Sequence, residues 1–369
     1  MSKTLTVGVD ASRAFEELPT GTEHYSRRVI EQLARGRHEL RLYVRRTPAG
    51  GAPAGADVRV LSAPRLWTHV ALATELALRP PDALFVPAHV LPLVVRVPTV
   101  VTVHDLGHRR FPAAHTRAQR LYLEWTARRH AVRATCLLAD SESTRADLSR
   151  FYGVPAERVV VAPLGVDEDM RPSSGEQVAA ARAAVGLAPG RDYVLYVGTL
   201  QPRKNLARLL LAWQAVARER PDVDLVLAGK AGWGGEDLPA LARRLGVAER
   251  VRFPGYVPRA RLPGLYSGAL ALAHPSLYEG FGLTVAEAMA CGTPVLVARS
   301  SSLPEVVGPA GLLVDPLEPR EIAAGLQRLL GDDNLRRRLA AAGRARAARF
   351  TWEACGTAVV RAVERAAGV

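Results

Sequence analysis

The sequence predicts an α/β protein with two similar halves, each built on a doubly wound parallel sheet. Short runs rich in β-branched residues alternate with longer amphipathic stretches, which is the pattern of βαβ units. This alternation stops at a polar, proline-bearing segment near residues 166–176 and then begins again. A chain of 369 residues is also about the length of two domains of common size. Each half is therefore expected to form a domain of its own.

Six strands are expected in the first half, each as a short apolar run. In chain order they are LTVGVD, LRLYVR, DALFVPA, PTVVTVHD, ATCLLADS and RVVVAPLG. The stretch HYSRRVIEQLAR between the first two strands predicts a helix, and STRADLSRFYG predicts a helix capped by a preceding serine. The glycine-rich residues 47–57 are predicted to form a loop.

Five further strands are expected in the second half, namely YVLYVGTL, VDLVLAGK, VRFPGYV, ALALAHPS and TPVLVA. Helical patterns separate them, among them LARLLLAWQAVARER and LPALARRLG. The chain ends in FTWEACGTAVVRAVERAAG, which is apolar along one face and predicts a final helix. Open parallel sheets bind ligands beyond the carboxyl ends of their strands, so functional residues are expected directly after strands.

Composition argues against several classes of protein. The three cysteines, Cys136, Cys291 and Cys355, lack the spacing of a disulfide framework or a zinc site, which favours a reducing cytosol. There is no secretion signal and no 18-residue apolar span, so neither export nor membrane spanning is expected. The net charge of +13 suggests an acidic partner, but only three of the 49 basic residues are lysine, which indicates an arginine-biased composition. With 6% aromatic residues and no recognised binding module, nucleic acid is not expected as a partner.

Two of the three lysines lie directly after predicted strands. Arg203 and Lys204 follow YVLYVGTL and precede a helix expected to start at about Asn205. Cations beside a helix N-terminus favour binding of a diphosphate. Gly229 and Lys230 repeat this arrangement after the next strand. The alternative for each pair is a capped helix with solvated charges.

The segment YEGFGLTVAEAMACGTPV, residues 278–295, contains two separated carboxylates. The preceding strand should deliver Ser276 and Glu279 to the site, while Gly280 and Gly282 allow the backbone to approach a ligand closely. A helix is expected from near Thr284, which places Glu287 one turn inside it, and the two carboxylates could then accept hydrogen bonds from two ends of one polar ligand. The alternatives are a solvated loop charge for Glu279 and, for Glu287, a capping box with Thr284.

Two weaker signals lie in the first half. His104 and Asp105 follow a predicted strand, although such a dipeptide also occurs as a structural pair. Gly21 lies in a turn, Thr20-Gly21-Thr22, that precedes a predicted helix.

A basic segment between Gly107 and Arg133 contains seven arginines and three histidines against one acid, Glu124, with Leu121, Tyr122 and Trp125 interleaved. A basic helix of this kind can dock on an anionic membrane surface. The alternative is an ordinary surface helix in an arginine-rich protein.

Together these motifs resemble the retaining, GT-B fold glycosyltransferases of glycosyltransferase family 4. The most specific element is the E-x7-E pattern from Glu279 to Glu287. Supporting motifs are YVGTLQPRKN, VHDL, DSESTRADLSRFYGVPAERVVVAPLGVD and SSLPEVVGPAGLLVDP. The resemblance covers almost the whole chain and is strongest to mannosyltransferases that build bacterial O-antigen and exopolysaccharide chains.

The resemblance implies a fold of two Rossmann-like domains that face a central cleft, with the C-terminal helix crossing back. Residues 1–168 would form the acceptor-side domain and residues 169–348 the nucleotide-sugar donor domain. Residues 349–369 would form the helix that packs back on the first domain.

The resemblance also implies roles for individual residues. Glu279 would bind donor-sugar hydroxyls and Glu287 the ribose hydroxyls. Arg203 and Lys204 would neutralise the diphosphate leaving group, and His104 would lie against the donor sugar near the acceptor. The implied catalytic set is His104, Arg203, Lys204 and Glu279. The residues expected to bind the donor are Gly21, Arg203, Lys204, Gly229, Lys230, Ser276, Glu279, Gly280, Phe281, Gly282, Leu283, Thr284 and Glu287. The family often has Gly-x-Gly around the position of Gly21, and this departure puts the phosphate contact there in doubt.

The implied reaction is retaining transfer of a hexose, most simply mannose from GDP-mannose, to a glycan or lipid-linked acceptor in cell-surface polysaccharide synthesis. For retention the resemblance implies front-face attack, with the departing phosphate oxygen taking the acceptor's proton. No residue stands out as an enzymic nucleophile. No metal is expected, since Arg203 and Lys204 supply the positive charge. Asp167-Glu168-Asp169, the local mimic of a metal-binding Asp-x-Asp, is interpreted as solvated acid in the linker.

Alternatives remain open at this stage. The donor could be a UDP-sugar carrying glucose or N-acetylhexosamine, or the protein could bind or epimerise a nucleotide sugar without transferring it. The expected location is the cytoplasm, with peripheral contact at the inner face of the plasma membrane as an open alternative.

Overall fold

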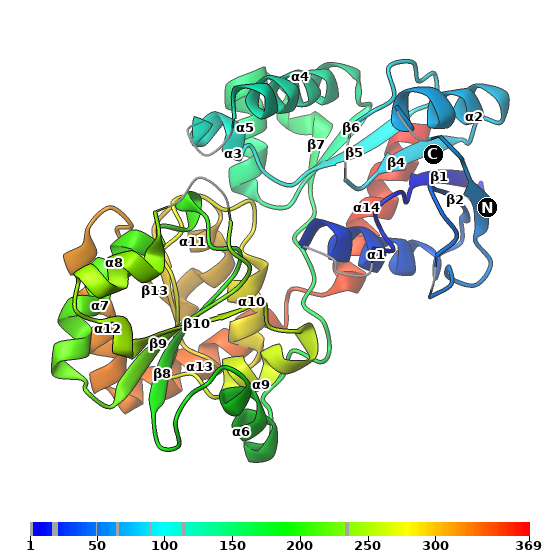
Figure 1. The fold of residues 1–369 in the computed structure, drawn as a ribbon. Coiled ribbons are helices and arrows are strands. Elements are labelled where there is room, and N and C mark those ends of the chain that lie inside the picture. The colour runs from blue at the N-terminus through cyan, green and yellow to red at the C-terminus, as the bar shows by residue number, and fades with distance from the viewer. Residues whose placement is uncertain are drawn as a thin grey trace. The chain divides into compact units, whose positions relative to one another are not determined.

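The computed structural model describes residues 3–16, 21–48, 50–63, 66–88, 90–112, 116–232 and 236–369. The chain divides into two compact units, which are described separately (Figure 1). The first unit contains residues 1–109, 117–165 and 351–369, and the second contains residues 110–116 and 166–350.

The first unit is built on a seven-stranded sheet with the order β3-β2-β1-β4-β5-β6-β7. All neighbouring strands are parallel. The strands are β1 (Thr6–Asp10), β2 (Glu39–Val44), β3 (Asp57–Val60), β4 (Ala83–Val86), β5 (Thr99–Val103), β6 (Cys136–Ala139) and β7 (Val159–Val161). The central strands are buried throughout, as expected where helices cover both faces of a parallel sheet.

The described helices of the first unit are α1 (Gly21–Leu33), a π-helical turn at Thr68–Leu72, α2 (Ala73–Leu78), α3 (Gly107–Arg110), α4 (Arg117–Arg133), α5 (Glu142–Tyr152), a 3-10 turn at Ala156–Arg158 and α14 (Trp352–Ala367). The serine cap predicted for α5 is confirmed: the Ser141 side chain accepts a hydrogen bond from the Thr144 amide. Gly153, with φ of 64°, ends this helix in the left-handed conformation that favours glycine.

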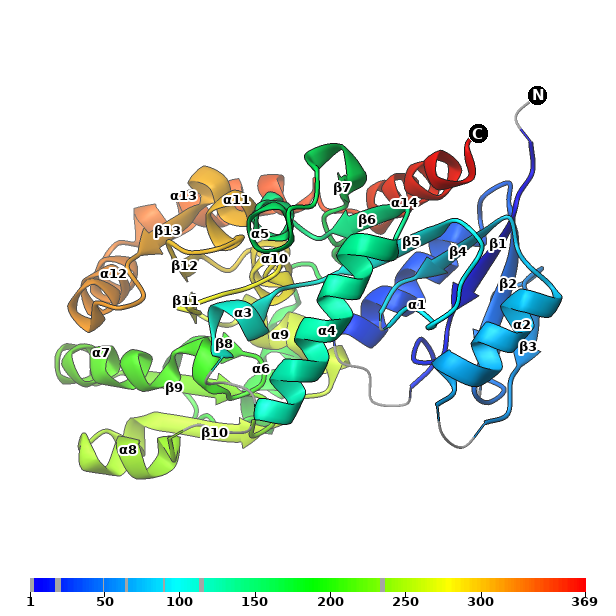
Figure 2. The ribbon, with the colours of Figure 1, turned by 90° about the horizontal axis from the view of Figure 1, so that it is seen from above.

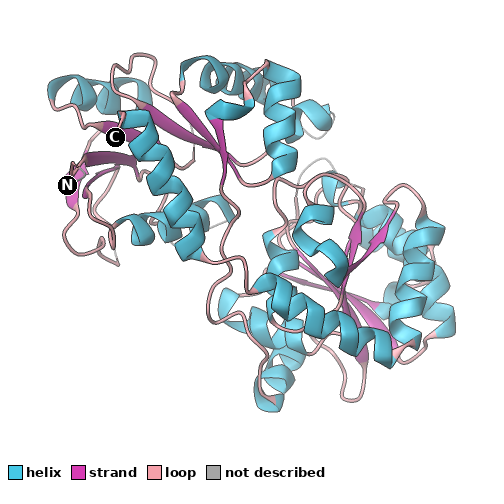
Figure 3. Cartoon of the chain, turned by 180° about the vertical axis from the view of Figure 1, so that it is seen from behind, coloured by secondary structure: helices cyan, strands magenta, loops and turns pink. Residues whose placement is uncertain are grey.

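The second unit contains a six-stranded parallel sheet with the order β10-β9-β8-β11-β12-β13. Its strands are β8 (Asp192–Val197), β9 (Val223–Ala228), β10 (Val251–Gly255), β11 (Ala271–His274), β12 (Val295–Ala298) and β13 (Gly311–Val314). In each unit helices lie on both sides of the strands (Figure 3). The two parallel sheets confirm the predicted pair of doubly wound halves.

The helices of the second unit are α6 (Gly175–Ala184), α7 (Leu206–Glu219), α8 (Leu238–Arg244), α9 (Leu262–Ser267), α10 (Leu283–Ala290), α11 (Leu303–Val307), α12 (Pro319–Gly331) and α13 (Asp333–Ala347). Short 3-10 turns lie at Pro202–Lys204, Ala248–Arg250, Arg259–Arg261 and Gly308–Ala310. Helices α7 and α12 contact each other, and Trp213 and Leu326 are among the fully buried residues of this core. Within the described part of the chain, no helix has the length and apolar character that crossing a bilayer requires.

Two strands were not expected from the sequence. Strand β3 starts at Asp57, so the predicted loop 47–57 ends one residue earlier than expected. Ala49, within this loop, lies outside the described residues. Strand β3 is an edge strand with alternating charges and no buried residue, which conceals the usual apolar signal. Strand β13 is only four residues long and begins at Gly311. Helix α6 starts inside the polar segment 166–176, because Ser174 and Gln177 form a capping box there.

The C-terminal helix α14 belongs to the first unit (Figure 2). It contacts α1 and strands β4, β5, β6 and β7, whereas the preceding helix α13 contacts α10 of the second unit. A methyl group at Gly165 would lie 2.6 Å from the Trp352 Cα atom, so this glycine lets the chain approach the start of α14. Two of the passages between the units, at residues 165–166 and 350–351, lie a few residues from the expected boundaries at 168 and 348, while residues 110–116 of the expected first domain belong to the second unit.

Asp10, the last residue of β1, should make the stability of the protein depend on pH. Its side chain is buried, and burial raises its pKa from 3.8 to about 6. Between these values the folded protein still holds the proton that the unfolded chain has lost, so stability should fall as pH rises from about 4 to about 6. The shift corresponds to about 3 kcal/mol at most. Asp10→Asn should remove this part of the pH dependence, and urea unfolding of both proteins at pH 4 and pH 7 measures it. Equal pH dependence of the two proteins would contradict the prediction.

Candidate functional site

Three loops of the second unit meet at the carboxyl ends of adjacent strands. Strand β11 pairs with β8 on one side and with β12 on the other, so the loops that follow these strands are neighbours. The loop after β8 carries Arg203 and Lys204 in the 3-10 turn Pro202–Lys204. The loop after β11 carries residues 275–282, and the loop after β12 carries residues 300–302. As predicted from the parallel sheet, the candidate residues lie directly after strands.

Glu279 is the centre of this site and is 7% exposed. Its Oε1 accepts hydrogen bonds from Lys204 Nζ at 2.5 Å and from His274 Nε2 at 2.8 Å, and its Oε2 accepts one from Arg203 Nη1 at 3.1 Å. Burial opposes the negative charge, but Lys204, Arg203 and His274 together hold the pKa of Glu279 well below its usual range. The predicted sugar-binding carboxylate and the predicted diphosphate-binding cations therefore form one ionic cluster.

Three consecutive serines after β12 brace the loop that carries Glu279. Ser301 Oγ accepts a hydrogen bond from the Glu279 amide at 2.8 Å. Ser302 Oγ donates to the carbonyl oxygens of Glu279 at 3.0 Å and Phe281 at 2.8 Å. Ser300 Oγ donates to the Ser276 carbonyl at 3.0 Å. The sequence motif SSLPEVVGPAGLLVDP includes Ser301 and Ser302 but not Ser300, and no role was predicted for any of the three.

The glycine turn before α10 is required by its surroundings. Gly282 has φ of 103°, and a Cβ atom there would lie 2.8 Å from Leu303 Cδ2. The first helical hydrogen bonds of α10 run from the Val285 and Ala286 amides to the Gly282 carbonyl. The amides of Leu283 and Thr284 lie in the first turn of the helix, before these hydrogen bonds begin. Amides in this position can bind an anion.

Two further predicted residues flank this turn. The Ser276 hydroxyl is fully buried and has no hydrogen-bond partner among the described residues. Gly280 is buried between Glu279 and Phe281, and the Phe281 ring packs edge-to-face on Phe350 with centroids 5.3 Å apart. An unpaired buried hydroxyl beside the turn is chemically suited to a polar ligand.

Glu287 is held by a second ionic cluster, and the capping-box alternative is wrong. Helix α10 is capped by Gly282, and Glu287 lies inside the helix at 2% exposure. Its Oε1 accepts a hydrogen bond from Arg259 Nη1 at 2.9 Å, and its Oε2 accepts one from the Tyr266 hydroxyl at 3.1 Å. Arg259 also donates to Asp167 Oδ2 at 2.6 and 3.0 Å. The interpretation of Asp167 as solvated acid is therefore also wrong.

Removal of Arg259 should destabilise the second unit. Although burial opposes the charge, Glu287 and Asp167 raise the pKa of Arg259 above its usual range, so the guanidinium stays charged. Arg259→Ala would leave two carboxylates without their shared cation, and we expect a loss of about 2 kcal/mol in unfolding free energy, because the arginine is a third exposed. The matched control is Arg261→Ala, an exposed arginine two residues away. Equal melting temperatures for the two variants would contradict the prediction.

Gly229 and Lys230, the predicted residues after β9, make other contacts than the residues of the cluster around Glu279. Gly229, with φ of 152°, lies so close to the Gly198 carbonyl that no side chain fits between them, which explains the glycine without a ligand. Lys230 is exposed, and its Nζ lies 4.9 Å from the centre of the Tyr256 ring. The contacts given by the structure do not link Lys230 to Glu279 or Glu287.

His104 belongs to the first unit and follows β5. Its Nδ1 lies 2.8 Å from Asp140 Oδ2 and its Nε2 lies 3.0 Å from the Pro87 carbonyl. Burial alone would lower the pKa of this imidazole, but the Asp140 carboxylate raises it above its usual range. The partner is thus Asp140 and not the adjacent Asp105, whose Oδ1 accepts the Gly107 amide at 2.8 Å.

Gly21 also belongs to the first unit, where it is the first residue of α1. It is exposed, and among the described residues no neighbouring side chain lies within 4 Å of the position that a Cβ would occupy. Thr20, the preceding residue of the predicted turn, lies outside the described residues.

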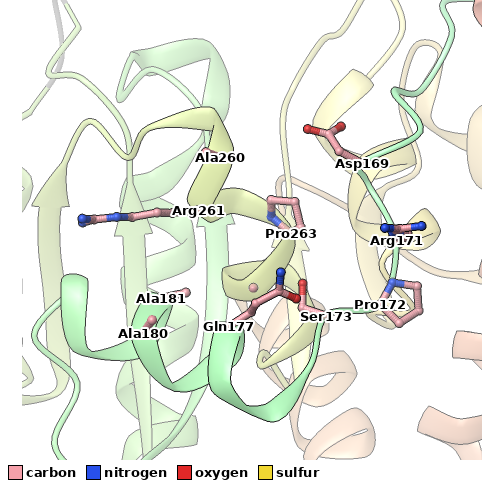
Figure 4. A pocket seen from close by; sticks show the side chains of 11 residues that line it. Asp169, Arg171, Pro172, Ser173, Gln177, Ala180, Ala181, Ala260, Arg261 and Pro263 are labelled. Carbon is pink, nitrogen blue, oxygen red and sulfur yellow. The ribbon is translucent and has the colours of Figure 1, made fainter.

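A cavity of about 720 Å³ lies elsewhere in the second unit (Figure 4). It is bounded by the segment from Asp169 to Ser173, by α6 and by the start of α9. Its lining shares no residue with the cluster around Glu279. Among the described residues, no three His, Cys, Asp or Glu side chains are grouped closely enough to hold a metal ion.

Comparison with known proteins identifies the family. Residues 19–170 match the family described as Glycosyltransferase Family 4, and residues 178–346 match Glycosyl transferases group 1. The chain is 38% identical over 264 residues to O-antigen chain mannosyltransferase B of Escherichia coli, a match that covers 71% of this chain and 69% of that protein. The chain belongs to glycosyltransferase family 4.

Other relatives of this family 4 chain carry names other than mannosyltransferase. It is 39% identical over 224 residues to D-inositol 3-phosphate glycosyltransferase of Segniliparus rotundus, a match that covers 59% of this chain and 49% of that protein. Anabaena HepE, solved in complex with UDP-glucose, has a similar fold, with a TM-score of 0.76 and 22% identity over 99% of this chain and 100% of that one. Family membership and the two parallel sheets confirm the predicted GT-B fold.

Several residues of the family 4 site were not identified from the sequence. His274 is the last residue of β11 and lies inside the predicted strand ALALAHPS, and Tyr266 lies in a short helix that was not predicted. Arg259 is one of many arginines, and nothing in its sequence neighbourhood indicates a contact with Glu287. A polar residue at the end of a buried strand, as in the case of His274, is the one signal that could have been used.

Proposed function

We propose that this glycosyltransferase moves a hexose, with retention of configuration, from a nucleotide diphosphate sugar to a glycan or lipid-linked acceptor in cell-surface polysaccharide synthesis. The observation that carries the proposal is the cluster of Glu279 with Lys204 and Arg203. It places two cations and an ionised carboxylate at one point beside the N-terminus of α10. A sugar diphosphate has hydroxyls for the carboxylate and phosphate oxygens for the cations.

Breakage of the bond between sugar and diphosphate builds negative charge on the leaving oxygens. Lys204 and Arg203 would stabilise that charge, together with the first-turn amides of α10, the Ser276 hydroxyl and, at the next strand end, Lys230. Fixed, partly buried positive groups such as Lys204 and Arg203 are worth on the order of 3 kcal/mol each in the barrier, and the exposed Lys230 is worth less. Because these cations are permanent, we expect transfer to continue in the presence of EDTA. A requirement for added Mg²⁺ or Mn²⁺ would contradict this part of the proposal.

The other predicted residues complete the assignment. Glu279 would bind sugar hydroxyls and Glu287 the ribose hydroxyls, which requires the ribose to share Glu287 with Arg259 or to displace it. His104 would contact the donor sugar, and Gly21 would lie near the phosphates. The acceptor hydroxyl would attack the front face of the sugar and pass its proton to a departing phosphate oxygen.

Mannose from GDP-mannose is the first candidate for the donor. This is supported by the 38% identity to an O-antigen mannosyltransferase. A UDP-sugar, the alternative that the sequence left open, is the second candidate, because another relative of similar identity is named D-inositol 3-phosphate glycosyltransferase, a name that specifies neither mannose nor a GDP-sugar.

The test is calorimetric titration with GDP, UDP, ADP and dTDP, followed by transfer assays with the matching sugar donors. Incubation with donor alone distinguishes epimerisation from transfer. Absence of binding to every nucleoside diphosphate would contradict the proposed function.

Helix α4 is a candidate membrane-docking surface. Leu121, Tyr122 and Trp125 are 70%, 52% and 42% exposed, and the Tyr122 and Trp125 rings stack with centroids 6.2 Å apart. Exposed arginines of the same helix are Arg117, Arg120, Arg128 and Arg133. An exposed apolar group with surrounding positive charge fits the surface of a bilayer containing anionic lipid.

We therefore expect the protein to float with liposomes that contain anionic lipid and not with neutral liposomes. Trp125→Glu should reduce flotation at least fivefold, because it removes apolar contact and adds a repelled charge. The matched control is Leu78→Glu, which changes an exposed apolar residue of α2. Equal flotation of both variants, or none by the wild type, would indicate an ordinary surface helix.

A further inference from the structure

A buried histidine that the proposed function does not use contacts the centre of the site. His274 is the last residue of β11 and is 1% exposed. Its Nε2 lies 2.8 Å from Glu279 Oε1. Its ring stacks on Tyr196 of β8, with centroids 5.6 Å apart and an angle of 16° between the planes.

The surroundings of His274 determine its protonation. The Glu279 carboxylate is ionised and can only accept, so Nε2 of His274 must carry the hydrogen. The other nitrogen, Nδ1, is buried and has no hydrogen-bond partner among the described residues. A second proton on Nδ1 would add a positive charge that has neither contact with solvent nor a hydrogen-bond partner among the described residues. The nearby charges of Lys204 and Arg203 would also repel it. Burial together with these cations lowers the pKa of His274, so the ring stays neutral.

The number of acceptor positions on Glu279 is limited. A carboxylate offers about four lone-pair positions, two on each oxygen. Lys204 and His274 occupy both positions of Oε1, and Arg203 occupies one position of Oε2. One position on Oε2 is left for a ligand.

We infer that His274 is a positioning residue that holds the Glu279 carboxylate so that Oε2 keeps one acceptor position for a donor-sugar hydroxyl. The inference rests on the proposed function, in which Glu279 binds the sugar. Stacking on Tyr196 prevents the imidazole from turning, so it acts as a fixed donor. Without this donor the carboxylate keeps only Lys204 and Arg203 of its described partners, so it is free to rotate and the cations can take the open position of Oε2.

The test uses two variants of His274 and one control. His274→Phe keeps a ring against Tyr196 and removes the donor, and His274→Gln restores an N–H donor near the same place. The control is Tyr196→Phe, which keeps the stacked ring and removes only a hydroxyl bound to the Thr199 carbonyl. Each protein is assayed for kcat and KM with the sugar donor, for binding of the free nucleoside diphosphate and for its melting temperature.

We expect His274→Phe to lower kcat/KM for the sugar donor by about 10- to 100-fold, the size of effect that a misplaced site residue produces. Binding of the free nucleoside diphosphate should stay within about threefold of wild type, because that ligand lacks the transferred hexose that Glu279 would bind. His274→Gln should recover most of the lost kcat/KM, and Tyr196→Phe should behave as wild type. The wild-type rate should show no break near pH 6.5 from this histidine.

Three outcomes would overturn the assignment. One is a His274→Phe enzyme with wild-type kcat/KM. Another is an equal loss of kcat/KM and of nucleoside diphosphate binding, which would indicate general damage to the site. The third is a failure of His274→Gln to recover activity although it melts at the wild-type temperature. If the wild type binds nucleoside diphosphates but transfers no sugar from any donor, the proposed function itself is wrong and this assignment falls with it.

Discussion

Lys204→Ala should reduce sugar transfer at least a hundredfold and also weaken binding of the nucleoside diphosphate. The ammonium is the nearest cation to Glu279, and its side chain is only 12% exposed, so water cannot replace it effectively. Loss of one preorganised charge costs about 3 kcal/mol in the barrier, which is about two powers of ten in rate. The alanine variant should still fold, because Arg203 and His274 remain bonded to Glu279.

The measurement is the initial rate of transfer, with the melting temperature as a check on folding. Lys230→Ala is the matched control, since it removes the lysine that follows the next strand, β9. Lys230 is exposed beside Tyr256, so solvent screening should limit its loss to less than about tenfold. Turnover by Lys204→Ala above about a tenth of wild type would show that this lysine does not neutralise the leaving group.

Glu279→Gln should reduce sugar transfer about as much as Lys204→Ala does. Binding of the nucleoside diphosphate, however, should be as tight as in the wild type or tighter. The amide keeps the shape of the side chain but lacks the charge that orders sugar hydroxyls. Lys204 and Arg203 lose their anionic partner and become fully available to phosphate oxygens. The two variants should therefore lose activity together and differ in their affinity for the diphosphate.

Glutamine is a better substitution than alanine at this position. Removal of the whole side chain would take the carboxylate away from two partly buried cations, and breaking a buried ion pair in this way costs about 3–5 kcal/mol. Calorimetric titration of Glu279→Gln with the preferred nucleoside diphosphate is the measurement. Weakened binding, parallel to that of Lys204→Ala, would show that the cations do not exchange the carboxylate for phosphate.

The sequence predicted where the functional residues lie better than which residues they contact. Parallel strands bring their carboxyl ends to one edge, so Arg203, Lys204 and Glu279 could be assigned to one region from their positions after strands. Their direct ion pairs could not be predicted, because 75 residues separate Lys204 from its partner. The glycine at position 282 was predicted to allow close approach, and the structure shows Leu303 against it.

The second cluster illustrates the limit of local patterns. Thr284 and Glu287 have the spacing of a capping box, but the helix begins at Leu283, two residues too early for Thr284 to cap it. Glu287 then faces Arg259 and Tyr266, which lie 28 and 21 residues earlier in the chain. In a chain with 49 basic residues, no single arginine carries a signal that would identify such a partner.

The pairing of Glu279 with Lys204 and Arg203 means that the proposed donor site supplies its own counter-ion. A diphosphate that enters meets cations whose charge Glu279 already offsets, so few small ions are released into bulk solution. The affinity for nucleoside diphosphate should therefore depend only weakly on ionic strength, unlike that of an open cationic pocket. For the same reason free orthophosphate and chloride should be poor competitors, so a phosphate-rich medium would leave the site open to its true donor.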